Sequence, residues 1–177
     1  MPAELKDRLS AQYSSNMRTG EVTEADTGNQ YRLTDCYDSG GAGLAASVDD
    51  YSLVIDALAC GGVAWNGYKL LSQESIDQMR TPQLNPDAQE NFAPTRGPMK
   101  MHAGYSYGLG VRTLIDPSES KSPVGEFGWD GAAGAYALID PSNRLSVFYA
   151  QEVLGMMKAY TEVHPSIRDL VYEGLAE

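Results

Sequence analysis

The residues most able to take part in chemistry lie in one glycine-rich stretch, where Trp129-Asp130-Gly131 is followed directly by two alanines. Asp130 could be a pocket carboxylate that binds substrate, although such a residue more often makes a local hydrogen bond. The glycines on either side, from Gly125 to Gly134, allow a ligand or another backbone segment to approach closely. The stretch therefore predicts a binding surface made largely of backbone.

A serine followed three residues later by a lysine is a second pattern with chemical potential, because a neighbouring amine can activate a hydroxyl nucleophile. The chain contains one such pair, Ser118 and Lys121. A working pair needs the start of a helix, so that the lysine lies one turn from the serine. Here Pro117 and Pro123 flank the pair in a charged segment, which predicts a solvated loop and no nucleophile.

Two β-rich runs follow the glycine-rich stretch, Ala135–Ile139 and Leu145–Tyr149. The intervening Asp140-Pro-Ser-Asn143 is typical of a hairpin with a loop of four or five residues. Both runs are apolar at nearly every position. We therefore expect both strands to be covered on both faces, in the middle of a layered sheet.

Helices and further strands are expected before and after this hairpin. The expected helices cover residues 3–15, 48–60, 72–81 and the segment after Val163, with Ser47 and Ser72 as N-caps and Gly61-Gly62 as a C-terminal stop. The predicted inward residues are Tyr51, Val54, Ile55 and Leu58 in the second helix and Ile167, Leu170, Val171 and Leu175 in the last. A strand is expected at 105–112, an irregular or edge hairpin at 16–34, a surface loop at 83–104 and a polar excursion at 115–123.

The order of these motifs resembles a known family. The triad at Trp129, then G-x-Y, a strand, D-P-x-N and a second strand resemble the serine β-lactamases of class C type and the related D-alanyl-D-alanine carboxypeptidases and family VIII esterases. The upstream order (Gly-Gly-x-Gly-Leu, a cap serine, a helix with Asp-Asp-Tyr, Gly-Gly, Asn-Gly and Leu-Leu-Ser) is also similar. The resemblance is clearest over residues 37–177. A tryptophan in the triad looks most like the esterase branch.

The resemblance implies acyl transfer through a serine ester, with two backbone N–H groups stabilising the oxyanion. Trp129 would line the pocket, Gly131 would let the substrate lie against the strand, and the N–H of Ala132 would be one oxyanion donor. Gly40 and Gly41 are further candidates to line the cleft. Asp130 stands where the family has an uncharged residue, so its negative charge would repel a carboxylate substrate.

The family's Ser-x-x-Lys and Tyr-x-Asn motifs lie upstream of every segment matched here. Tyr13-Ser-Ser-Asn16 has the wrong spacing for Tyr-x-Asn. The leading hypothesis is therefore that residues 1–177 are the C-terminal portion of a β-lactamase-like hydrolase domain, an α+β unit with an antiparallel sheet and packing helices that forms an incomplete part of the β-lactamase/transpeptidase-like fold. It would need its N-terminal half as a partner and would be inert alone towards a small-molecule ester or amide. The alternatives are a non-catalytic module that binds a partner through an open sheet edge, and an enzyme that uses its own residues such as Asp130 and Tyr136.

Composition limits the other function classes. The net charge of −11 argues against a nucleic-acid partner, which needs a basic surface. No run approaches the ~20 apolar residues of a membrane span, and the start has no signal-peptide core, which favours a cytoplasmic location. Cys36, Cys60 and the two histidines match no metal pattern, so no cofactor or metal is expected. Cys60 is expected on a buried helix face. An exposed sheet edge would allow homo-oligomers.

Overall fold

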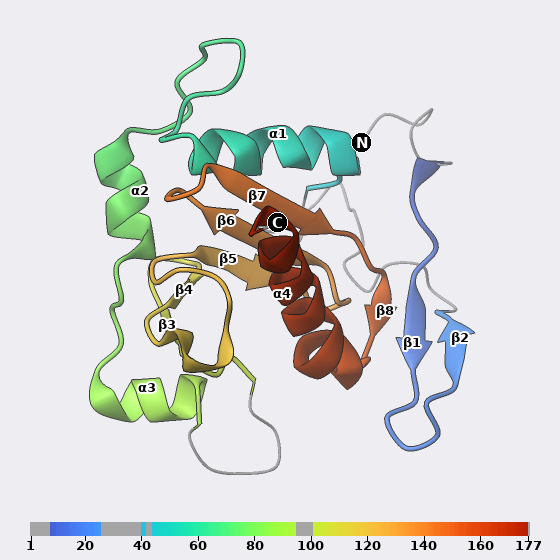
Figure 1. The fold of residues 1–177 in the computed structure, drawn as a ribbon. Coiled ribbons are helices and arrows are strands. Elements are labelled where there is room, and N and C mark those ends of the chain that lie inside the picture. The colour runs from blue at the N-terminus through green and yellow to red at the C-terminus, as the bar shows by residue number, and fades with distance from the viewer. Residues whose placement is uncertain (1–7, 26–39, 42–43, 95–100, 177) are drawn as a thin grey trace.

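A five-stranded antiparallel sheet forms the centre of the computed structural model, which describes residues 8–25, 40–41, 44–94 and 101–176 (Figure 1). Four α-helices surround this sheet, and a second sheet of three short strands lies beside it. The expected α+β class with an antiparallel sheet is confirmed.

The five strands follow each other in space in the same order as in the chain. They are β3 (Tyr105–Tyr107), β4 (Arg112–Leu114), β5 (Phe127–Asp130), β6 (Tyr136–Asp140) and β7 (Leu145–Tyr149). The single strand expected at 105–112 is wrong. The backbone N–H of Gly108 donates to the carbonyl of Val111 and closes a turn, so the segment forms β3, a turn and the start of β4.

Strand β6 is buried at every position because helices cover both of its faces. Successive side chains of a strand point to opposite faces. Ile139 packs in a core with residues of α1 (Val48–Ala59) and α2 (Gln73–Arg80), whereas Tyr136 and Asp140 contact α4 (His164–Leu175). The two-sided cover predicted for the first run is confirmed. The prediction for the second run is wrong, because β7 is an edge strand of intermediate burial.

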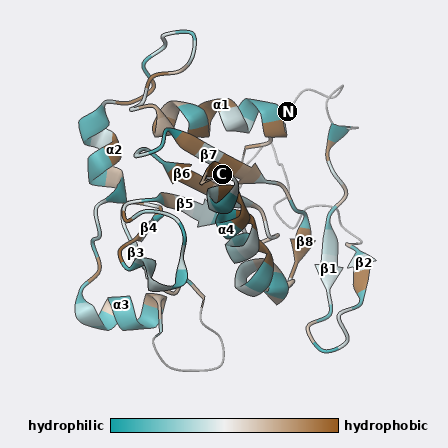
Figure 2. Ribbon diagram, viewed as in Figure 1, coloured by the Kyte–Doolittle hydropathy of each residue, from teal (hydrophilic) through white to brown (hydrophobic). Residues whose placement is uncertain are grey.

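The hairpin that joins these two strands is confirmed. The carboxylate of Asp140 accepts hydrogen bonds from the backbone N–H groups of Ser142 and Asn143 and so fixes the loop. Figure 2 shows hydrophobic residues gathered on β6 and β7 beneath α1.

Helices α1 and α2 begin at the predicted caps, since Ser47 and Ser72 accept hydrogen bonds from the backbone N–H groups of Asp50 and Ser75. Ile55 and Ile76 are buried as expected. The predicted burial of Tyr51 and Val54 is wrong, as is that of Cys60, because all three are exposed to solvent in the structure. Helix α1 therefore carries four exposed apolar residues, namely Val48, Tyr51, Leu53 and Val54. The ring of Tyr51 also contacts that of Phe148 in β7.

A third helix interrupts the segment expected to be a loop. Helix α3 (Pro86–Phe92) starts at Asn85, whose side chain accepts a hydrogen bond from the N–H of Ala88. The N–H at the first helical position has no acceptor within the helix, so proline, which lacks an N–H, is well tolerated there. Asn-Pro therefore marks a helix start in this segment.

The last helix begins after a π-helical turn, η3 (Ala159–Val163). The predicted apolar stripe of α4 is wrong, because Leu170 and Leu175 are exposed and His164 and Arg168 are the buried residues. The buried face of α4 is polar because it meets polar groups of the sheet and of the loop before β5: Tyr172 donates to Asp140, and Arg168 donates to the carbonyl of Glu119.

The small sheet joins the two ends of the described chain. Strand β1 (Tyr13–Ser15) pairs antiparallel with β2 (Val22–Glu24) and parallel with β8 (Val153–Leu154). The helix expected over 3–15 is therefore wrong at residues 13–15, while its first five residues lie outside the described part. The edge hairpin expected over 16–34 is present, but it starts earlier, and residues 26–34 are likewise not described.

Candidate functional site

The predicted triad lies at the C-terminal end of β5, with its side chains on two faces of the sheet. Trp129 pairs with Ala137 and Asp130 pairs with Tyr136 across the β5–β6 ladder. Residues directly opposite each other share a face. Trp129 is thus on the face covered by α1, and Asp130 is on the face covered by α4.

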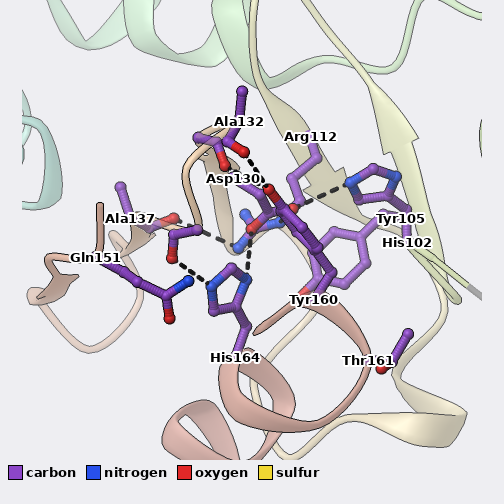
Figure 3. Close-up of polar contacts among 12 residues, drawn as sticks. His102, Tyr105, Arg112, Asp130, Ala132, Ala137, Gln151, Tyr160, Thr161 and His164 are labelled. Atoms are coloured by element: carbon purple, nitrogen blue, oxygen red, sulfur yellow. Dashed lines mark hydrogen bonds and ion pairs between the residues drawn. The ribbon is translucent and has the colours of Figure 1, made fainter. Parts of the chain in front are cut away.

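Asp130 is the centre of a polar cluster on the α4 face (Figure 3). Its carboxylate accepts a hydrogen bond from His102 Nε2 at 3.0 Å, and Arg112 Nε lies 3.5 Å away. Burial opposes its ionisation, but the charge of Arg112 and the hydrogen bond from His102 outweigh burial and lower the pKa of the carboxyl below its ordinary value. Asp130 is therefore a paired anion, and its partners come from segments 18 to 34 residues away in the sequence, not from its local neighbours.

Arg112 is the cation that balances this cluster. Its guanidinium carbon lies 4.8 Å from the ring centroid of Tyr105 and 4.9 Å from that of Tyr136, and its side chain is 2% exposed. Both rings provide cation–π contacts in a place that water hardly reaches. Burial works against the charge, yet Glu126 and Asp130 raise the pKa of Arg112 above its ordinary value, so the guanidinium stays charged.

Glu126 is the second carboxyl beside Arg112 and is fully buried. It accepts hydrogen bonds from the hydroxyls of Tyr105 at 2.6 Å and Ser122 at 3.1 Å. Burial raises its pKa, although Arg112 and these two donors oppose the shift. The two carboxyls of the cluster therefore have pKa values displaced in opposite directions.

His164 links the cluster to the turn after β5. Its Nε2 lies 2.8 Å from the carbonyl oxygen of Gly134, and because a carbonyl only accepts, Nε2 carries the proton. Its Nδ1 lies 3.5 Å from the second carboxylate oxygen of Asp130 and makes no hydrogen bond within the described residues. The ring also stacks on Tyr136, with centroids 4.7 Å apart.

A cavity of about 370 Å³ opens beside this cluster. His102, Asp130, Tyr160 and His164 line it, together with Met101, Ala103, Tyr105, Arg112, Glu119, Tyr136, Thr161, Pro165 and Arg168. Of the residues predicted from the sequence to act in a site, Asp130 and Tyr136 contribute to this lining. Trp129, Gly131 and Ala132 do not.

Trp129 lies on the more open side of the strand end, 41% exposed. Its ring contacts those of Phe92, His102 and Tyr107 at centroid distances of 6.4, 5.9 and 5.2 Å. Phe92 comes from α3 and Tyr107 from β3, so three separate elements build this aromatic group. It presents a largely apolar surface at the end of β5.

Ala132 belongs to the turn that joins β5 to β6. Gly131 N–H donates to the carbonyl of Ala135 and Gly134 N–H donates to the carbonyl of Gly131. The N–H of Ala132 has no acceptor within the described part of the chain, and the residue is exposed. At Gly131, a Cβ would come within 3.3 Å of the Cβ of Ala135, so the close packing of the turn is one reason for glycine there.

Strand β5 thus ends in an aromatic-x-glycine triad, and the N–H of the next residue, Ala132, has no acceptor within the described residues. The family model "Beta-lactamase" matches residues 2–171. The chain belongs to the β-lactamase family.

Two curated relatives of this β-lactamase-family chain come from Mycobacterium tuberculosis. They are the uncharacterized protein MT1414 of strain CDC 1551 / Oshkosh and protein Rv1367c of strain H37Rv. Each is 32% identical over 114 residues, which is 62% of this chain and 27% of the relative. The chain thus spans about a quarter of the length of these relatives.

Solved structures of the same fold are also longer than this chain. A mutant of simvastatin synthase (LovD) from Aspergillus terreus superposes with a TM-score of 0.74 at 20% identity, over 97% of this chain and 44% of that one. EstCE1, a hydrolase with promiscuous acyltransferase activity, gives 0.67 at 21% identity, over 94% and 44%. The expected β-lactamase-type fold is confirmed.

The other predicted site residues of this β-lactamase-family chain lie apart from the cavity. Gly40 and Gly41 are exposed, and neither they nor the serine–lysine pair contributes to its lining. Ser118 is in the short 3₁₀ turn η2 (Pro117–Glu119), and the ammonium of Lys121 pairs with the carboxylate of Glu173. Lys121 is thus engaged by α4 at the surface.

The described ranges carry neither a metal-binding cluster nor a membrane-spanning helix. Within them, no three His, Cys, Asp or Glu side chains are arranged to hold a metal ion. No helix formed by those residues is both long enough and apolar enough to cross a bilayer.

Sequence reasoning missed four residues of the site: His102, Arg112, Tyr160 and His164. In the sequence they lie 18 to 34 residues from Asp130, and none belongs to a recognisable motif. The fold brings them together around Asp130 and the turn after β5. One signal was available. His164 stands directly before a helix-starting proline, but the position indicates a helix start and not a contact.

Proposed function

We propose that the end of β5 forms one wall of an acyl-transfer active site, in a hydrolase that cleaves a small-molecule ester or amide through an acyl-serine. The observation that carries this proposal is the N–H of Ala132, which has no acceptor within the described residues and follows the partly exposed Trp129 by three positions, in a chain of the β-lactamase family. Preorganised N–H groups stabilise the oxyanion of a tetrahedral intermediate. Trp129, Gly131 and Ala132 are the wall residues.

The nucleophile of this reaction would lie outside the chain. Ser118 is the one serine in the sequence followed by lysine at the third position, and Lys121 is held by Glu173. A serine whose lysine is paired elsewhere lacks the base that it needs. We therefore propose that residues 1–177 are the C-terminal portion of a longer domain and are inert on their own, and that the cofactor-free chemistry depends on the missing N-terminal half.

The exposed apolar residues of α1 and of the turn after it support a missing partner surface. Val48, Tyr51, Leu53 and Val54 are each at least 40% exposed along this helix, and Trp65 and Tyr68 protrude from the following turn. Contiguous exposed apolar residues mark surfaces that pack against another protein segment. In the absence of the other half, the same surface favours homo-oligomers.

The open side of the strand end favours apolar ester substrates over acidic ones. Trp129, Phe92 and Tyr107 contribute rings to it, and the carboxylate of Asp130 is on the opposite face and paired with Arg112. These features support the esterase-like reading of the triad over a true β-lactamase.

The test is hydrolysis of p-nitrophenyl acetate and of a chromogenic cephalosporin, with a serine-reactive phosphonate followed by intact mass. We expect the chain alone to give no turnover and no adduct, and Ser118→Ala to behave identically. Turnover, with an adduct that Ser118→Ala abolishes, would overturn the fragment proposal. A polypeptide that joins this chain to an upstream Ser-x-x-Lys segment is expected to hydrolyse the ester faster than the cephalosporin.

A non-catalytic binding module is the second candidate, favoured by one observation. Strand β2 is an edge strand whose three residues, Val22 to Glu24, are all exposed. Exposed edges can pair with a strand of another chain. A stable monomer in analytical ultracentrifugation would favour this module over the half-domain, whose uncovered apolar helix predicts self-association.

A further inference from the structure

The turn between β5 and β6 is held by side chains that come from the C-terminal part of the chain. Gln151 Nε2 donates to the carbonyl of Ala133 at 3.3 Å, and His164 Nε2 donates to the carbonyl of Gly134 at 2.8 Å. The hydroxyl of Tyr160 lies 2.8 Å from the carbonyl oxygen of Gly131 and 3.0 Å from that of Ala132. All four successive carbonyl groups of the turn are thus contacted by these three side chains.

The contact of Tyr160 has a definite direction. A carbonyl oxygen only accepts, so the single proton of the tyrosine hydroxyl is donated and shared between the two oxygens. The ring of Tyr160 stands on the same side of the turn as His164 and points at the backbone (Figure 3). Rotation of either peptide plane would break one of these two hydrogen bonds.

Peptide geometry carries this constraint to the predicted oxyanion donor. The carbonyl of Gly131 and the N–H of Ala132 belong to one planar peptide group, and the described chain has no cis peptide bond. In a trans peptide the C=O and N–H point in opposite directions. The Gly131 carbonyl accepts from Tyr160 and also from the N–H of Gly134 at 2.9 Å. Gly134 acts from within the turn, whereas Tyr160 fixes the turn to the C-terminal helical segment, and the carbonyl held in this way directs the Ala132 N–H to the other side, away from Tyr160.

The backbone that presents Tyr160 is unusual. Residues Ala159–Val163 form a π-helical turn, closed by the N–H of His164 donating to the carbonyl of Ala159. Such turns occur frequently at functional sites, where they change the direction of side chains. This turn comes directly before α4 and places Tyr160 and His164 on the same backbone segment.

We propose that Tyr160 is a positioning residue that sets the direction of the Ala132 N–H. Its importance for catalysis rests on the proposed function, but the orientation itself does not. Tyr160 is not placed to touch the substrate, because it contacts the far side of the turn. It acts through the Gly131–Ala132 peptide group.

The test compares Tyr160→Phe with Tyr172→Phe in the 177-residue chain. The control removes a hydroxyl that donates to Asp140 at 2.8 Å, also from the C-terminal helical segment but away from the turn. Residual dipolar couplings of backbone N–H groups report bond direction. We expect the Ala132 coupling to change in Tyr160→Phe, while those of Phe127 and Leu138 in the neighbouring strands stay the same. Tyr172→Phe should leave all three unchanged.

An Ala132 coupling that is unchanged in Tyr160→Phe, or changed equally in Tyr172→Phe, would overturn the proposal. In a polypeptide completed with the Ser-x-x-Lys segment, Tyr160→Phe should lower kcat roughly tenfold with KM unchanged, since oxyanion donors act in the transition state. A change confined to KM would contradict the role. If no completed polypeptide is active, the proposed function fails, and the couplings still decide whether Tyr160 orients the turn.

Discussion

The two sides of the β5 end differ in how completely their polar groups are paired. On the α4 side, Asp130 is surrounded by Arg112, His102 and His164, and nearly all of these groups are buried. On the other side, Trp129 is partly exposed, and the N–H of Ala132 has no acceptor among the residues that the structure describes. The charged groups of the α4-side cluster are paired with one another and hold the strand end in place, whereas the more open side is left able to bind. Two adjacent residues of β5 thus have different roles: Asp130 stabilises the strand end, and Trp129 is available to contact a ligand.

Arg112→Met should give the largest effect. The change leaves Glu126 and Asp130 without their buried cation, and breaking a buried ion pair by removing one partner costs about 3–5 kcal/mol of the free energy of unfolding. Urea unfolding followed by circular dichroism measures this loss. Arg80→Met is the matched control: Arg80 pairs with the more exposed Asp77, so its loss should cost about 1 kcal/mol or less. Equal losses for the two variants would show that the Arg112 cluster is not the stronger support.

The acid dependence of stability should follow Asp130. Its pKa is lower in the folded chain than in the unfolded chain, so its contribution is complete above the unfolded pKa of about 4 and is lost as the pH falls towards the folded value. Asp130→Asn should therefore flatten the loss of stability below about pH 4 in urea titrations at several pH values. The pKa of Glu126 is raised in the folded chain, so the stability contributed by its protonated carboxyl is lost as the pH rises. Glu126→Gln should therefore flatten a loss of stability at higher pH, the opposite of the effect of Asp130→Asn. If the free energy of unfolding of Asp130→Asn still falls below about pH 4 as it does in the unmodified chain, other carboxyls are responsible for the loss.

Trp129→Ala should have a smaller effect on stability than Arg112→Met. The ring is partly exposed and loses contacts with Phe92 and Tyr107, each aromatic pair being worth about 0.5–1.5 kcal/mol. Urea unfolding would detect the change, and Trp129→Phe should restore most of it. A loss as large as that of Arg112→Met would mean that both sides of the strand end are structural.

Local chemistry was readable from the sequence, whereas contacts between distant segments were not. Ser47, Ser72 and the hairpin loop at Asp140 bond to backbone groups within three residues, so residue type and spacing predicted them. Asn85 caps α3 in the same way, through its side chain and the N–H of Ala88. The Asn-Pro pair is a local signal for this helix, whereas the Pro-, Asn- and Gln-rich composition of the segment favours a loop.

The polar side of α4 was not predictable in this way. Periodicity analysis assumes that a helix buries its apolar residues, but His164 and Arg168 are buried because carbonyl groups of Gly134 and Glu119 meet them. Those carbonyls are 30 and 49 residues away in the chain. The same holds for Tyr160, whose role depends on a turn that sequence patterns locate but do not connect to it.

The pairing of β1 with β8 has a consequence for the order of folding. Gln12, just before β1, contacts Glu152, just before β8, across 140 residues. Contacts of such long separation form slowly, because closing the loop costs entropy before the pairing repays it. During synthesis the β1–β2 hairpin has both edges unpaired until β8, which pairs with β1, has left the ribosome. A chaperone that shields the first 25 residues is therefore expected to raise the yield of folded chain more than one that binds the β6–β7 hairpin. Strands β6 and β7 are neighbours in the sequence and can pair with each other as soon as both have emerged.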